Sequence, residues 1–169
     1  MEITFEKTEI EGVLVVNYDK FQDNRGYIYT SYLDRLFSEQ SLPLFTHDKF
    51  TFSKKNVLRG IHYDRNTTKL VTSIIGEIDQ IVVDMRTDSK TYKKHLRFVM
   101  NNQKKFSVII PPMVGNAFLV KSESSIYHYK LSYNGEYKDH NDQFTIKWND
   151  PSLNICWGIS NPILSERDQ

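Results

Sequence analysis

The chain has 169 residues, with 22 basic and 21 acidic side chains and a formal net charge of +1. This near-neutral balance, without a basic block, argues against nucleic acid or a membrane surface as the partner. No apolar run approaches the roughly 18 residues of a membrane-spanning helix. A chain of this length suits one domain, which we expect to span residues 1–169 around a buried core.

The cysteine content and the N-terminal sequence indicate the compartment. Cys156 is the single cysteine, so it has no partner for an internal disulfide, and a cysteine-rich zinc site is excluded. Residues 1–10, MEITFEKTEI, lack the basic region and apolar core of a signal peptide. We therefore expect a cytoplasmic protein.

The first third of the chain predicts two strands. The 10 tyrosines, 10 phenylalanines and 2 tryptophans bias the whole chain toward β structure. Residues 13–18, VLVVNY, predict a strand. Residues 21–29, FQDNRGYIY, predict a polar turn that closes at Gly26 and runs into a second strand.

Residues 31–40, SYLDRLFSEQ, predict a helix. Ser31 is in position to cap it, and Pro43 would stop its continuation. Four large apolar side chains recur at helical spacing within it: Tyr32, Leu33, Leu36 and Phe37.

The rest of the chain predicts short strands with turn signals between them. Gly76 marks a tight connection between two of them. This pattern, with one apolar face on each strand, favours an antiparallel sandwich, a jelly roll or a barrel. The predicted strands cover residues 47–53, 69–75, 77–85, 95–100, 105–112, 117–122, 125–132 and 143–148.

Three segments predict irregular structure. Residues 111–118, PPMVGNAF, predict a turn before a strand, in which Asn116 either makes the turn or points its amide into a cavity. Residues 148–157 predict a structural corner. Residues 161–169, NPILSERDQ, end the chain on charges, and such an end normally frays.

The segment LRGIH places Arg59 and His62 three residues apart, and Lys69 begins the next predicted strand. Cationic groups are costly to bury in an apolar β region without an anionic partner. A diphosphate or carboxylate ligand would offset that cost, and arginine suits phosphate geometry. The alternative is that Arg59 and Lys69 face water and His62 is structural.

The histidine spacing argues against a catalytic metal. Metal sites in small barrels usually take His, Asp or Glu at strand spacing, such as His-x-His. The five histidines lie nowhere two residues apart: His47, His62, His95, His128 and His140.

Residues 126–132, IYHYKLS, place Tyr127, Tyr129 and Leu131 on one face of a predicted strand. A tyrosine there is either a core residue with a satisfied hydroxyl or a general acid opposite a histidine base. A free phenol has a pKa near 10, and a neighbouring cation would lower that pKa.

These pieces, in this order, resemble the dTDP-4-dehydrorhamnose 3,5-epimerase family over nearly the whole chain. The resemblance implies an all-β, cupin-type jelly-roll barrel with a few short helices, which dimerises and needs no metal or cofactor. It also implies an enzyme that inverts carbons beside the 4-keto group of a nucleotide-linked sugar. The matching motifs are FQDNRG, VLRGIHYD followed by KLV, GEIDQIVVDMR followed by SKTY, IPPxxxNxF, YK, WNDP and PILSERD.

The resemblance assigns the catalytic roles. His62 matches the general base, and Tyr129 matches the acid that protonates the intermediate from the other face. Asp168 matches the carboxylate that orients the histidine, with Asp84 as the alternative.

The resemblance also assigns substrate contacts. Arg59 and Lys69 match residues at the sugar and its oxyanion, and Arg25 matches an arginine on the diphosphate side. A dimer that shares its N-terminal strands would bring Arg25 or Tyr27 into the neighbour's site.

The chain departs from the family pattern where nucleotide and sugar are recognised. The usual QDN is HDK, from His47 to Lys49, and a usual glutamate is Thr30. The usual histidine of GFAHGF is Asn116, which leaves open whether C3, C5 or both are inverted. In the longer segment 129–144, Tyr133 and Tyr137 are both candidates for stacking on the base.

This combination resembles the subgroup that acts on GDP-linked 4-keto-6-deoxy-heptoses in capsular heptose synthesis. Other functions stay open from the sequence: a sugar-nucleotide 3,4-ketoisomerase, a non-catalytic sugar-nucleotide binder, or a purely structural barrel. The last alternative predicts that His62, Tyr129 and Lys69 do not converge on a cavity.

Overall fold

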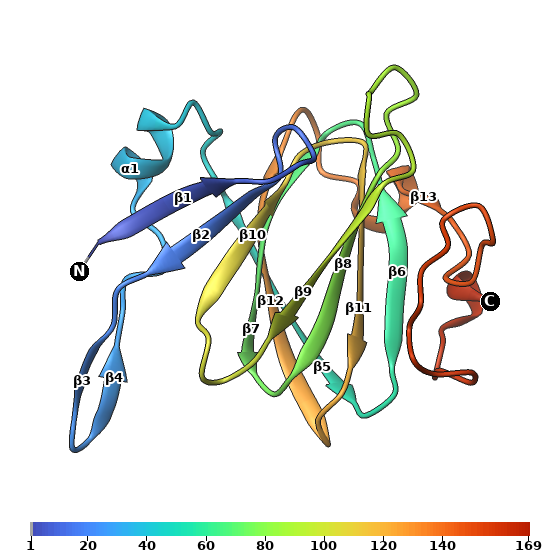
Figure 1. Ribbon diagram of the computed structural model, residues 1–169. Coiled ribbons are helices and arrows are strands. Elements are labelled where there is room, and N and C mark those ends of the chain that lie inside the picture. The colour runs from blue at the N-terminus through green and yellow to red at the C-terminus, as the bar shows by residue number, and fades with distance from the viewer. Residues whose placement is uncertain (1) are drawn as a thin grey trace.

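The computed structural model describes residues 2–169 and consists mainly of two antiparallel sheets (Figure 1). A six-stranded sheet has the order β1-β2-β10-β7-β12-β5, formed by Ile3–Lys7, Leu14–Tyr18, Phe106–Ile110, Thr67–Ile75, Ser124–Tyr133 and His47–Lys54. A five-stranded sheet has the order β13-β6-β11-β8-β9, formed by Phe144–Thr145, Leu58–Tyr63, Val114–Val120, Ile78–Asp84 and His95–Met100. A small hairpin, β3 (Phe21–Asp23) and β4 (Gly26–Ile28), projects from the N-terminal side.

Helical structure is limited to three short pieces. They are α1 (Asp34–Glu39) and two 3₁₀ turns, η1 (Asp139–Asp142) and η2 (Glu166–Asp168). The all-β prediction is therefore confirmed. No helix within residues 2–169 has the length and apolar character needed to cross a membrane.

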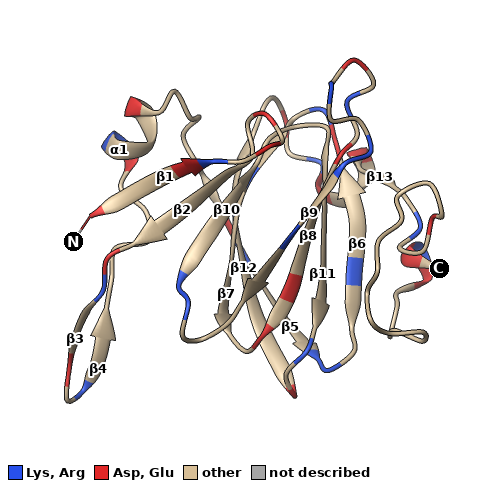
Figure 2. Ribbon diagram, viewed as in Figure 1, with Lys and Arg blue, Asp and Glu red and all other residues tan. Residues whose placement is uncertain are grey.

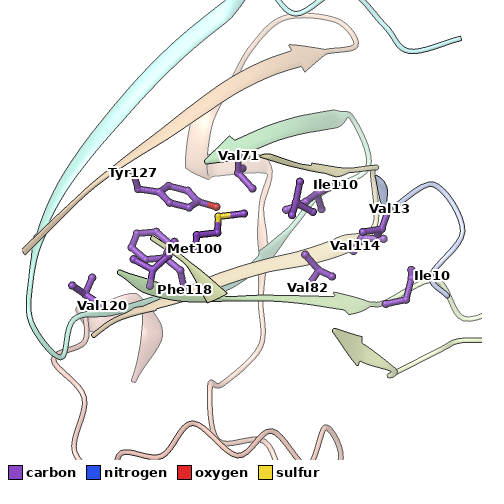
Figure 3. Packing of buried hydrophobic residues seen from close by; sticks show 12 residues of the cluster. Ile10, Val13, Val71, Val82, Met100, Ile110, Val114, Phe118, Val120 and Tyr127 are labelled. Atoms are coloured by element: carbon purple, nitrogen blue, oxygen red, sulfur yellow. The ribbon is translucent and has the colours of Figure 1, made fainter. Parts of the chain in front are cut away.

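Apolar side chains from both sheets meet between them and form the main core. Figure 3 shows Val71, Phe118 and Tyr127 in this cluster, all fully buried. Such residues alternate along their strands with outward-facing ones, as expected for a sheet with a covered face. Charged residues of both signs are interspersed along the chain (Figure 2).

Two further clusters cover the outer faces of the sheets. The C-terminal segment packs Leu153 and Trp157 against the five-stranded sheet. Helix α1 packs Phe37 against the six-stranded sheet. The C-terminal segment is therefore fixed along the sheet that carries β6.

The helix is shorter than its pattern predicts, and its proposed cap is wrong. Leu33 is the N-cap residue, and no side chain caps the helix, so Ser31 does not have this role. Tertiary packing holds this single turn and a half, because the Phe37 ring lies 4.7 Å from the Tyr32 ring and is almost fully buried.

Most predicted strands are confirmed, with four differences. The segment LRGIH is itself a strand, β6, and Gly115 and Asn116 lie inside β11 rather than in a turn. The strand predicted over 143–148 contracts to the two residues of β13, and β1 was not predicted. The sequence pattern did not predict strands at β6 and at the start of β11, because Gly60 and Gly115 lie there and glycine is depleted in strands.

Candidate active site

One end of the space between the sheets is a polar pocket. It lies among β5, β7 and β12 of one sheet and β6 and β11 of the other, and has a cavity volume of about 130 Å³. Its lining residues are Lys49, Thr51, His62, Thr67, Lys69, Asn116, Tyr129, Leu131, Tyr137, Asp139 and Gln143. His62, Tyr129 and Lys69 therefore converge on a cavity, which contradicts the purely structural alternative.

A register shift between β6 and β11 sets the direction of the Arg59 and His62 side chains in LRGIH. Asn116 pairs with His62 and Phe118 pairs with Arg59, so β6 advances three residues while β11 advances two. The extra residue lets Arg59 and His62 share one face, although residues three apart in a regular strand point to opposite faces.

Gly60 makes this shift sterically feasible. Its φ is +112°, and a Cβ there would lie 2.4 Å from the backbone oxygen of Asn116. A larger residue would push β6 away from β11. The close approach of β6 to β11 therefore explains the glycine in LRGIH.

His62 and Asp168 form a hydrogen-bonded pair at the pocket. His62 Nε2 lies 2.6 Å from Asp168 Oδ1, and the aspartate side chain is almost fully buried. Burial acts to raise the pKa of Asp168, but hydrogen bonds from His62, Ser165 and the Gly60 amide bring it below its ordinary value. Because the ionised carboxylate only accepts, Nε2 carries the proton in the neutral imidazole, and the lone pair of that form is on Nδ1.

The end of the chain is ordered around this contact, so the expectation of a frayed tail is wrong. Asp168 sits in η2 and also accepts a 2.9 Å bond from the Ser165 hydroxyl. The parallel bridge between Val57 and Ile163 ties the preceding segment to the start of β6.

Asp84, the alternative orienter, does not contact His62. Its carboxylate accepts bonds from Arg86, Ser89 and Thr91 and organises the turn after β8. Asp84 is the last residue of β8, and the side chains that bond to its carboxylate belong to the turn that follows.

Tyr129 enters the pocket from β12, in the sheet opposite His62. Burial raises the pKa of its phenol well above the ordinary value, and the charge of Arg59 opposes this rise only in part. A neighbouring cation therefore acts to lower this pKa, as the sequence predicts, but burial outweighs it. The phenol is protonated at neutral pH.

Lys69 is buried in the pocket wall, which contradicts the idea that it faces water. Its Nζ lies 3.6 Å from Asp64 Oδ2, longer than a hydrogen bond. Burial lowers the pKa of Lys69, and the Asp64 charge opposes that shift. Asp64 Oδ1 is held by the backbone amides of Asn66 and Thr67.

Arg59 is half-buried and is not among the residues that line the pocket. Its Nε donates a 3.0 Å hydrogen bond to the Ser53 hydroxyl on β5, and its charge acts on Tyr129. An arginine held this way keeps further N–H donors for an anionic ligand.

The other side of the pocket carries an aromatic and charged group from β5 and the loop after β12. Lys49 Nζ lies 2.6 Å from Asp139 Oδ1 and donates to the Tyr137 hydroxyl at 3.2 Å. The His47 ring lies 4.7 Å from the Tyr137 ring. This set offers a flat aromatic surface beside one donor and one acceptor.

Apart from Asp168, which contacts His62, five candidate residues do not line the pocket: Arg25, Tyr27, His47, Arg59 and Tyr133. Arg25 and Tyr27 lie in the β3–β4 hairpin, where Arg25 is largely exposed and pairs with Asp23. Tyr133 is next to Tyr137, but its hydroxyl bonds to Asp142 at 2.5 Å and it does not line the pocket.

Some lining residues were missed by sequence reasoning. Thr67 and Leu131 lie two residues from Lys69 and Tyr129, so the strand period of two contained the signal for them. Asp139 and Gln143 come from the irregular segment after β12, where no periodicity applies.

Comparison of the sequence with known families gives one consistent result. The dTDP-4-dehydrorhamnose 3,5-epimerase profile matches residues 7–169. A dTDP-4-dehydrorhamnose 3,5-epimerase from Methanothermobacter thermautotrophicus is 31% identical over 176 residues, covering 99% of this chain and 92% of the relative. One from Shigella flexneri is 34% identical over 167 residues, covering 96% and 91%.

Solved structures agree with these matches. The dTDP-6-deoxy-D-glucose-3,5-epimerase of Legionella pneumophila, in complex with dTDP-4-keto-L-rhamnose, superposes with a TM-score of 0.90 at 27% identity. It covers 99% of this chain and 90% of that chain. The dTDP-4-dehydrorhamnose 3,5-epimerase of Elizabethkingia anophelis gives 0.89 at 29% identity, covering 99% and 93%. The expected cupin-type jelly-roll barrel is thereby confirmed.

Proposed function

Because this chain belongs to the dTDP-4-dehydrorhamnose 3,5-epimerase family and is an epimerase, we propose how its pocket acts on a nucleotide-linked 4-keto-6-deoxy sugar. The proposal is that His62 and Tyr129 invert C3, C5 or both. The observation that carries it is their approach to one cavity from opposite sheets.

His62 is the base in this proposal. The 4-keto group acidifies the protons on the neighbouring carbons, and Nδ1 of a neutral imidazole accepts one of them. Asp168 holds the other ring nitrogen, so the imidazolium that forms is stabilised by a charge 2.6 Å away.

Lys69 stabilises the intermediate in this proposal, and Arg59 is the alternative cation. When the proton leaves carbon, the electron pair moves through C4 and leaves negative charge on the former ketone oxygen. A buried ammonium with its carboxylate partner at 3.6 Å, beyond hydrogen-bond distance, can bond to that oxygen in a site of low dielectric.

Tyr129 returns a proton to the opposite face of the carbon. The phenolic O–H bond breaks, the C–H bond forms, and the double bond returns to the ketone. Burial supports this role because it raises the pKa of Tyr129 and keeps the phenol protonated until the enolate forms. The phenolate then recovers a proton from solvent, and His62 releases the one it took.

We propose a GDP-linked heptose as the substrate, with the base beside His47, Lys49, Tyr137 and Asp139. Guanine carries adjacent N1–H and N2–H₂ donors, which a carboxylate accepts as a pair, whereas thymine offers one N–H. Asp139 is the acidic residue beside the Tyr137 ring. The Tyr137 hydroxyl and the Asp139 carboxylate both contact Lys49. The carboxylate of Asp139 and the aromatic surface of Tyr137 support a guanine here. We also propose that the protein acts in the cytoplasm.

The test is NMR in D₂O with a GDP-linked 4-keto-6-deoxy-heptose, beside dTDP-4-keto-6-deoxy-glucose. We expect deuterium at C3, C5 or both of the GDP sugar, and its loss in His62→Asn. His128→Asn is the matched control, because His128 pairs with Asp48 at 2.7 Å but does not line the pocket.

Other outcomes decide against the proposal. Binding without deuterium exchange from either substrate would indicate a non-catalytic binder. A product whose ketone has moved to C3 would indicate a 3,4-ketoisomerase. Faster deuterium exchange with the dTDP sugar would contradict only the choice of guanine and would leave the proposed epimerisation in place.

A further inference from the structure

A chain of buried amides runs from the core to the pocket. Gln80 on β8 is fully buried, and its Nε2 donates to Asn116 Oδ1 at 2.7 Å and to the Ile81 carbonyl oxygen at 3.0 Å. Its Oε1 accepts a 2.5 Å bond from the Tyr127 hydroxyl. Asn116, on β11, is the strand partner of His62 and lines the pocket.

The chemistry of these partners fixes which way each amide points. The Ile81 carbonyl can only accept, so the end of Gln80 beside it must be the NH₂ group. That NH₂ has a second hydrogen, which is directed at Asn116, so the atom of Asn116 beside it must be the carbonyl oxygen. The Tyr127 hydroxyl lies 3.3 Å from the same atom, but its one hydrogen is donated to Gln80, so the Gln80 amide alone fixes the direction of Asn116.

The remaining end of Asn116 is its NH₂ group. Within residues 2–169 this group makes no hydrogen bond to protein, although Asn116 is almost fully buried and borders the pocket. This nitrogen is not among the fully buried unpaired atoms of the described residues, so it faces the space of the pocket, where a ligand oxygen can accept from it. The pocket is therefore lined at Asn116 by a donor rather than an acceptor.

We propose that Gln80 is a positioning residue that locks Asn116 with its N–H groups toward the C4 oxygen of the sugar. This inference rests on the proposed function, since it assigns the donor to the oxygen that becomes negative. Asn116 is the strand partner of His62, so a group that contacts it lies beside the carbon that His62 deprotonates. Asn116 and Lys69 then bind the same oxygen from opposite sheets.

Two substitutions test the direction of the donor. Gln80→Glu keeps the shape of the side chain but places an oxygen where the NH₂ stood, so the Asn116 amide turns and presents its oxygen to the pocket. Asn116→Asp presents an acceptor directly. For both, we expect kcat to fall roughly 10- to 100-fold with KM changed less than about threefold, because the bond strengthens as charge develops.

The Tyr127→Phe variant distinguishes an effect on the orientation of the Gln80 amide from an effect on packing around Gln80. It removes the hydroxyl from Gln80 but leaves the Ile81 carbonyl, which alone fixes the Gln80 amide. We expect its kcat to stay within about threefold of the wild type. If Tyr127→Phe loses as much kcat as Gln80→Glu, Gln80 acts through packing and the proposal is wrong.

A measurement on the unaltered protein covers the case in which a variant does not fold. The side-chain ¹⁵N amide signal of Asn116, identified by its absence in Asn116→Asp, should shift on addition of the GDP-linked 4-keto sugar and not with GDP alone. No shift with the sugar, or an equal shift with GDP, overturns the inference. A raised KM with unchanged kcat in Gln80→Glu overturns the assignment to C4. Failure of the proposed function is distinct, because then the wild type exchanges no deuterium.

Discussion

The contact between His62 and Asp168 determines which ring nitrogen of the histidine is basic. We predict that Asp168→Asn lowers the rate of deuterium exchange on the order of 10²- to 10⁴-fold, the range in which positioned proton transfer contributes. The asparagine NH₂ would donate to Nε2 and leave the proton on Nδ1, where the substrate proton should arrive. Rates of exchange under saturating substrate measure this effect.

Ser165→Ala is the control for that variant. It removes one 2.9 Å hydrogen bond to the other carboxylate oxygen and leaves the His62 contact in place. A much smaller loss is expected. Equal losses in the two variants would mean that Asp168 acts by holding the chain end rather than by setting the tautomer of the imidazole.

Individual residues of the site differ in how far the sequence predicts them. Lys69 and Tyr129 follow from strand periodicity, because the apolar pattern fixes the inner face of each strand. Asp168 could be named only through the family resemblance, because 106 positions separate it from His62. Gln80 carries no local signal, since its role depends on atoms of β8, β11 and β12 together.

At the level of elements, the register shift between β6 and β11 is what brings Arg59 and His62 to one face. We predict that Gly60→Ala lowers the free energy of unfolding by roughly 3–5 kcal/mol, since strain at positive φ adds to a backbone clash. The added Cβ would lie 2.4 Å from the Asn116 oxygen. Thermal or urea unfolding measures the change.

Gly158→Ala is the matched variant for backbone strain. Gly158 also has a positive φ, +68°, but no atom lies within 4 Å of its added Cβ. A loss of only about 1–2 kcal/mol is expected there. Similar losses in both variants would show that the approach of β6 to β11 is not the limiting contact.

The turn after β8 is stabilised by an ionised carboxylate. Burial acts to raise the pKa of Asp84, but hydrogen bonds from Arg86, Ser89 and Thr91 hold it well below its ordinary value. We predict that Asp84→Asn costs about 3–5 kcal/mol at pH 7, the range for breaking a buried ion pair. The urea midpoint measured from pH 7 downward tests this.

The pH dependence follows from the sign of that shift. Because the folded-state pKa is the lower one, the stabilisation is complete above the unfolded pKa, near 3.9, and is lost as pH falls through the folded pKa. The gap between wild type and variant should therefore begin to narrow below about pH 4 and close only below the folded-state pKa of Asp84. Asp150→Asn, at an exposed carboxylate bonded to Ser152, should leave the midpoint nearly unchanged. A gap for Asp84→Asn that does not change with pH would contradict the charge argument.

Element types were more predictable than element boundaries. Strand β9 was recognised because its apolar residues alternate toward one buried face, and β10 because its apolar run is buried on both faces. Strands β6 and β11 contain glycines at close backbone approaches, which a propensity argument reads as turns. Helix α1 is shorter than predicted because packing of Phe37, rather than capping, decides its extent.

At the scale of the whole molecule, apolar surface remains exposed on two N-terminal features. Phe50 and Phe52 on edge strand β5 are 64% and 63% exposed, and Phe21 and Ile28 on the projecting hairpin are 58% and 62% exposed. Uncovered apolar groups on a free sheet edge favour association with another chain. We therefore keep the prediction of a homodimer, and light scattering at micromolar concentration measures it.

The dimer prediction has a sharper form, in which Arg25 serves the partner's pocket. Arg25 is 83% exposed at its side chain and pairs only with Asp23, two residues away, within the described chain. Mixing His62→Asn with Arg25→Ala subunits then gives heterodimers with one intact site, built from the histidine of one chain and the arginine of the other. With random exchange, half of the dimers are mixed and each restores one of two sites. Exchange activity should therefore recover to about a quarter of the wild type, although each variant alone is impaired. If activity after mixing stays at the average of the two variants, Arg25 does not act across the interface, and the hairpin then serves association alone.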